Sequence, residues 1–167
     1  MNGYGDGAPV RFVIDVDGRD SPVRRTLAYR SAPDFPSIDP DRIGKAYRDF
    51  WMLGISRAGQ PGWKFFDQLV HANWSSDSIE VYQAPEGHYL GGEPIFIPAA
   101  LGNERASGAV ICQDFDAAAC QSSFIVFDAF NVARGPVARL RLPGAIPFGF
   151  QASFNRAFCR SKRQTES

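Results

Sequence analysis

Residues 123–128 read S-F-I-V-F-D, and residues 137–142 read V-A-R-L-R-L. The first run is apolar almost throughout, which is typical of a strand that is buried on both faces. The second run alternates apolar and basic residues, which is typical of a strand with one face in a core and the other in solvent. Both runs have ordinary strand lengths. This part of the chain therefore predicts β-sheet.

Similar β-type runs recur along the rest of the chain and are separated by turn residues such as Asp17 and Gly18. They cover residues 11–16, 26–30, 47–56, 64–73, 79–83, 94–98 and 109–115. The prolines within residues 33–40 argue against an ordinary central strand there. Only residues 40–47 and 116–120 look faintly helical. We predict an all-β chain of antiparallel meanders, which is compatible with propeller blades or with a sandwich.

The composition is that of an ordinary globular protein. A length of 167 residues favours one domain, and 18 basic against 18 acidic residues give no support for a nucleic-acid partner. The cysteines at positions 112, 120 and 159 are odd in number and lack zinc-site spacing, so we expect a reducing, cytoplasmic location. We expect no signal peptide and no membrane span. The 14 phenylalanines favour an aromatic core, or side chains that line a pocket for a long apolar ligand.

Catalytic signals that need no family knowledge are weak. The two histidines, His71 and His88, lie on different predicted elements, and no common catalytic or phosphate-binding motif is present. The pair Gly91 and Gly92 is typical of a turn or bulge at a strand entry. Glu93 directly precedes the apolar run 94–98, so its carboxylate is expected at a sheet edge or partly buried, where it needs a partner.

Four segments in order resemble the carotenoid cleavage oxygenase family. They are D-F-P-S-I-D-P-D-R-I-G-K-A-Y-R at 34–48, K-F-F-D-Q-L-V-H-A-N-W at 64–74, Y-L-G-G-E-P-I-F-I-P at 89–98 and L-R-L-P-G-A-I-P-F-G-F-Q-A-S-F at 140–154. The pair E-P-x-F-x-P and L-P-x-x-x-P-F-G-F is specific. The resemblance runs from about residue 2 to residue 155, leaves 156–167 as a tail, and covers the last third of a family member. Residues 1–167 are therefore expected to form a single partial domain.

The resemblance implies a fold, a cofactor and a chemistry. The family fold is a seven-bladed β-propeller, of which this chain would form the last two to three blades. Iron(II) on the propeller axis is held by four histidines, and it activates dioxygen to split an alkene bond of a carotenoid or apocarotenoid. Glutamates that hydrogen-bond to these histidines orient them.

The resemblance also implies roles for individual residues. Glu93 matches one of the orienting glutamates, and Asp34 stands where the family usually has the longer glutamate. Gln151, in Pro147-Phe148-Gly149-Phe150-Gln151, stands at the position of the last iron-ligating histidine and would be a weak ligand or none. Asn2 matches a motif whose histidine would precede Met1, and the acidic turn of the family is absent at 103–108. His71 and His88 match positions that the family does not use as ligands.

We therefore expect a fragment of an iron-dependent oxygenase that is inactive as this chain alone and does not bind iron by itself. One alternative is a non-catalytic β-domain that binds an isoprenoid or completes another propeller. Another is assembly with an upstream propeller fragment that carries the missing histidines. An apolar carotenoid-like molecule is the expected small-molecule partner, no nucleic acid is expected, and peripheral membrane contact stays open.

Overall fold

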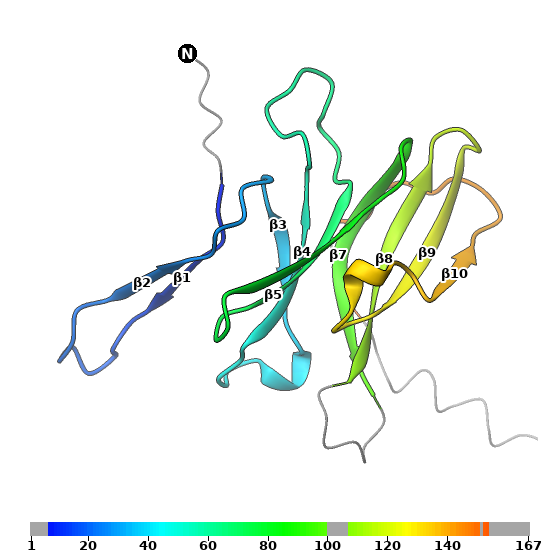
Figure 1. Ribbon diagram of the computed structural model, residues 1–167. Coiled ribbons are helices and arrows are strands. Elements are labelled where there is room, and N and C mark those ends of the chain that lie inside the picture. Colours follow the sequence, from blue (N-terminus) through cyan, green and yellow to red (C-terminus); the bar gives the residue numbers. More distant parts are fainter. Residues whose placement is uncertain (1–6, 100–106, 151, 154–167) are drawn as a thin grey trace, which may run out of the picture.

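The computed structural model describes residues 7–99, 107–150 and 152–153 (Figure 1). Over these residues the chain forms ten strands and two short 3-10 helices, which confirms the all-β prediction. In chain order the elements are β1 (Val10–Val13), β2 (Val23–Thr26), β3 (Asp34–Ser37), η1 (Pro40–Arg42), β4 (Asp49–Gly54), β5 (Gln68–Asn73), β6 (Ser78–Gln83), β7 (His88–Pro98), β8 (Gly108–Asp116), β9 (Gln121–Asp128), η2 (Val132–Arg134) and β10 (Ala138–Arg141). No helix within these ranges is long and apolar enough to cross a membrane.

The strands form two four-stranded sheets and one two-stranded ribbon. The first sheet has the order β3-β4-β5-β6, the second has the order β10-β9-β8-β7, and β1 pairs with β2 in the ribbon. Every pair is antiparallel and joins strands that follow each other in the chain. Figure 1 shows the ribbon extending away from the two sheets. The predicted meanders are therefore confirmed.

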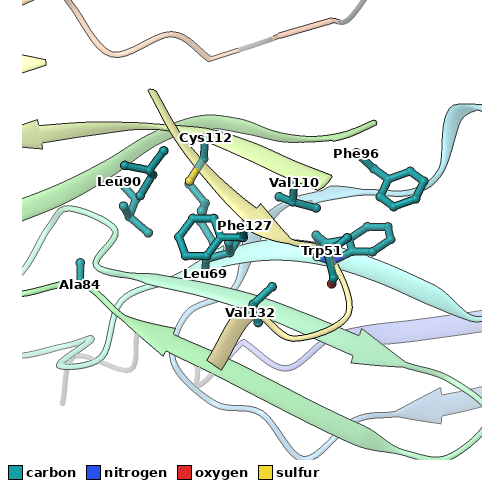
Figure 2. Packing of buried hydrophobic residues seen from close by; sticks show 12 residues of the cluster. Trp51, Leu69, Ala84, Leu90, Phe96, Val110, Cys112, Phe127 and Val132 are labelled. Carbon is teal, nitrogen blue, oxygen red and sulfur yellow. The ribbon is translucent and has the colours of Figure 1, made fainter. Parts of the chain in front are cut away.

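The core lies where the two sheets face each other. Trp51 and Leu69 from the first sheet pack with Phe96, Val110 and Phe127 from the second (Figure 2). A second cluster, built from Leu27, Tyr29, Phe50, Met52, Val70, Ala72 and Trp74, lies on the opposite face of the first sheet. Alternate residues of β4 serve the two clusters because successive side chains of a strand point to opposite faces. The first sheet is thus buried on both sides.

Strand ends differ from the prediction at β1, which ends at Val13, and at β5, which begins at Gln68. Three further segments differ more. β2 ends at Thr26, where the predicted strand 26–30 begins, because Leu27 and Tyr29 pack into the second cluster instead of extending the strand. β7 begins at His88, ahead of the predicted start at 94. The faintly helical residues 116–120 form the turn between β8 and β9, because the Asp116 carboxylate accepts hydrogen bonds from the backbone amides of residues 118 and 119.

Candidate functional site

The edge strands of the two sheets lie side by side. The hydroxyl of Ser37 on β3 donates a hydrogen bond to the carbonyl oxygen of Pro94 on β7. Each strand is the outermost member of its own sheet. Asp34 and Glu93, the two acids that the resemblance singles out, therefore lie on neighbouring edge strands.

Glu93 lies beside a small apolar pocket. In the pairing of β7 with β8, the register shifts between the pair Gly91–Gln113 and the pair Ile95–Ile111. Glu93 lies between these two pairs, at an irregular point of β7. The pocket has a volume of about 220 Å³. Its walls are formed by Gly91, Gly92, Glu93, Ile95, Ile111, Cys112, Gln113, Phe124, Ile146, Pro147, Gly149 and Ala152. Glu93 is partly buried, and within the described part of the chain its carboxylate has no hydrogen-bond or ion-pair partner. The carboxylate can therefore accept a hydrogen bond from another donor.

Residues 146–149, here called the pocket wall, close one side of this pocket. The amide of Gln113 donates to the carbonyl oxygens of Ile146 and Pro147 at 3.3 and 3.2 Å, and its oxygen accepts from the backbone amide of Gly149 at 3.3 Å. The ring of Phe148 packs against Gly91, where a Cβ atom would lie 2.0 Å from Cδ1 of the ring. The pocket wall is thereby held against the residues that precede Glu93.

Asp34 is engaged locally. Its carboxylate accepts a hydrogen bond of 2.8 Å from the backbone amide of Phe35, and the side chain is exposed. Phe35 has a φ of 53°, which is uncommon for a bulky residue, and it packs edge-on against Phe66 with ring centroids 5.5 Å apart. In this structure Asp34 therefore stabilises a bulge of β3 (the register shifts between Asp34 and Ser37).

The two histidines are each paired with an aspartate. His71 is 8% exposed, and its Nε2 lies 3.0 Å from Oδ1 of Asp49. His88 Nδ1 lies 3.1 Å from Oδ1 of Asp114. Neither partner is Glu93. Gln151 and the residues 2–5 and 103–106 that the resemblance also uses lie outside the described residues.

A charged cluster in the second sheet escaped the sequence analysis. Asp114 on β8 is 1% exposed and is bound by Arg139 of β10, by Ser123 of β9 and by His88 of β7. Burial raises the pKa of the nearby Cys112 thiol, and the Asp114 charge raises it further. The sequence signal was an acidic and a basic residue, Asp114 and Arg139, in otherwise apolar strands. Charged groups that are buried need a partner. The cluster joins all four strands of the sheet.

The part of the chain that the structure describes does not supply a metal site by itself. It holds no group of three or more histidine, cysteine, aspartate or glutamate side chains that could bind a metal ion. Its two histidines are bound to Asp49 and Asp114. These residues therefore do not fit the family's iron alone, and they support no reaction step through it.

Neighbouring four-stranded antiparallel meanders of this kind are the blades of a β-propeller, and solved structures show the same architecture. The chain superposes on the lignostilbene dioxygenase of Pseudomonas brassicacearum with a TM-score of 0.73 and 27% identity, covering 85% of this chain and 31% of the other. It also superposes on a cobalt-substituted apocarotenoid oxygenase of Synechocystis with a TM-score of 0.73 at 22% identity, which shows the fold alone. The described residues thus form two propeller blades and a two-stranded ribbon.

The family follows from the sequence match. The family model for the retinal pigment epithelial membrane protein matches residues 4–156, and the chain belongs to this family, which confirms the resemblance to carotenoid cleavage oxygenases. Resveratrol cleavage oxygenase 1 of Chaetomium globosum is 28% identical over 84% of this chain, and apocarotenoid-15,15'-oxygenase of Synechocystis is 25% identical over 86%. The chain spans only 28% of the length of either relative.

Proposed function

We propose that this chain contributes two blades to an iron-dependent oxygenase that splits an alkene bond with dioxygen. The iron ligands come from outside the described residues, and the chain is inactive alone. When bound, the metal activates dioxygen. The observation that carries the proposal is Glu93, which lines an apolar pocket from an edge strand beside β3 and whose carboxylate has no partner among the described residues. Glu93 is suited to accept a hydrogen bond from a metal-binding imidazole and so to orient it.

The substrate class is an apolar alkene. The relatives named above include enzymes for resveratrol, lignostilbene and apocarotenoids, so stilbene and carotenoid chemistry are both candidates. The mainly apolar walls of the pocket beside Glu93 are consistent with such a substrate. Gln151 stands at the family's last ligand position, and an amide oxygen is a weaker ligand for iron(II) than an imidazole. Gln151→His should therefore raise the iron affinity of the complete protein.

Product analysis tests the proposal. The complete protein that carries this chain is loaded with iron(II) without oxygen and then exposed to air with a stilbene or an apocarotenal. We expect two carbonyl products from at least one substrate, only in the presence of both iron and dioxygen. Glu93→Gln should lower the yield about 10- to 100-fold. If neither the stilbene nor the apocarotenal gives products, or if products form without oxygen, the proposal is contradicted.

A second candidate is a non-catalytic role in which the chain binds an apolar molecule or completes another propeller. Phe12 and Ile14 of the ribbon region are more than half exposed. Within the described ranges β6 and β10 pair with a strand on one side only, and such edges invite pairing with another chain. A monodisperse chain that carries pigment but no iron would favour this role. We also propose a reducing, cytoplasmic location, which is compatible with the free thiols of Cys112 and Cys120.

A further inference from the structure

Gln113 occupies a central position between the second sheet and the pocket. It lies on β8, opposite Gly91 of β7 and Phe124 of β9. The side chain is 5% exposed, and both ends of its amide are hydrogen-bonded to the pocket wall. A buried amide with every bond directed at one segment fixes the position of that segment.

The pocket wall has no strand ladder of its own. Residues 146–149 are irregular, so their backbone groups depend on side chains. The hydroxyl of Ser122 accepts a hydrogen bond from the amide of Ile146 at 3.0 Å and donates one to the carbonyl oxygen of Ile146 at 3.3 Å. Gln113 bonds the carbonyl oxygen of Pro147 and the amide of Gly149. Gln113 is thus the side chain that bonds the backbone of Pro147 and Gly149, while the ring of Phe148 packs against Phe115 and Phe65.

The position of the pocket wall matters for Glu93. Phe148 packs against Gly91, and the carbonyl oxygen of Gly149 would lie 3.6 Å from a Cβ atom at Gly92. These two glycines directly precede Glu93, and the pocket wall and Glu93 line the same pocket. A shift of the pocket wall would therefore change the shape of the pocket that Glu93 lines.

We infer that Gln113 is a positioning residue for the proposed oxygenase site. It fixes the pocket wall against the Gly91–Gly92 corner and so sets the geometry in which Glu93 meets its donor. This role rests on the proposed function. It requires an amide, because methionine of similar length has no hydrogen bonds to offer and glutamate lacks the two donor contacts.

The test compares Gln113→Met with wild type in the complete protein that carries this chain. Gln121→Met is the matched control, because Gln121 donates to Leu142 and not to the pocket wall. The first measurement is amide hydrogen exchange of the peptide that spans 146–149 in metal-free protein. The second is a titration with cobalt(II), followed by its visible absorption and yielding the metal affinity.

We expect Gln113→Met to speed exchange of the pocket-wall peptide about tenfold and to weaken cobalt binding about tenfold, while Gln121→Met changes neither by more than about twofold. Gln113→Glu should keep part of the protection at Gly149, since it retains an acceptor. Unchanged exchange overturns the inference, and faster exchange with unchanged cobalt affinity and spectrum also overturns it. A wild-type protein that takes up no cobalt contradicts the proposed function, and the exchange measurement then decides the anchoring on its own.

Discussion

The ring of Phe148 lies so close to Gly91 that a Cβ atom on Gly91 would stand 2.0 Å from Cδ1 of the ring. Gly91→Ala must therefore displace Phe148 and with it the pocket wall. We expect a loss of about 1–3 kcal/mol in the free energy of unfolding, as for other overpacked sites. Chemical unfolding of the complete protein measures this loss.

Gly144→Ala is the control for Gly91→Ala, because no atom of the described residues lies within 4 Å of a Cβ atom at Gly144. It should leave the stability within about 0.5 kcal/mol of wild type. Phe148→Ala should remove most of the additional cost of Gly91→Ala, since the ring is the obstacle. Additive effects of Gly91→Ala and Phe148→Ala would show that the two residues do not touch.

Two buried tryptophans should respond differently to the same substitution. The indole Nε1 of Trp51 donates to the carbonyl oxygen of Ala129 at 2.7 Å, whereas the buried Nε1 of Trp74 has no hydrogen-bond partner in the part of the chain that the structure describes. Trp51→Phe leaves a buried carbonyl without a donor, so it should cost about 1–3 kcal/mol more than Trp74→Phe. Urea unfolding of both variants measures the difference, and equal costs would contradict the assigned bond.

The buried Asp114 depends on its ion pair with Arg139. Arg139→Met should destabilise the protein by about 3 kcal/mol, because it leaves a carboxylate that is 1% exposed without its arginine. Asp114→Asn combined with Arg139→Met should cost less than the sum of the single changes. The exposed pair of Arg25 and Asp77 is the control, and Arg25→Met should cost less than about 1 kcal/mol. Additive effects at Asp114 and Arg139 would contradict a coupled pair.

Tyr29 should make the free energy of unfolding depend on pH in the alkaline range. Burial raises its pKa to about 12, and its hydroxyl donates to Gln68 at 2.6 Å. Because the folded protein holds the phenol proton more tightly than the unfolded chain, this stability is fully present below about pH 10 and is lost as the pH rises to about 12. Tyr29→Phe should flatten that fall in unfolding measurements between these pH values. An equally steep fall in the variant would assign the dependence to other groups.

The sequence predicted the strands that carry the core. It was less informative where side-chain contacts, and not strand pairing, determine the position of the backbone. Residues 123–128 lie within β9 and residues 137–142 include β10, so both strands are confirmed. Their expected burial is wrong, because Phe124 of β9 is 36% exposed and Leu140 of β10 is 56% exposed. Gly91 and Gly92 were interpreted as a turn or bulge at a strand entry. They lie inside β7 at the start of a register shift, which agrees with a bulge, and the absence of a side chain at Gly91 admits Phe148. The packing of Phe148 against Gly91 joins residues that are far apart in the chain, so the local sequence pattern did not predict it.

Of the candidate site, only Glu93 was predictable without the resemblance. Glu93 was singled out as an acid before an apolar run, and the structure places it at the pocket. The role of Gln113 could not be predicted, because its three bonds join residues far apart in the chain. Asp34 keeps a carboxylate, but its bond to Phe35 shows that a shorter side chain can serve its own backbone.

The affinity of the complete protein for iron(II), measured for wild type and for Glu93→Gln, tests the central claim most directly. The account predicts stoichiometric iron in the wild type and an affinity about 10- to 100-fold lower in Glu93→Gln, because the amide no longer offers a charged acceptor to a metal-binding imidazole. Equal iron affinity in the two proteins, or no iron in either, would contradict it.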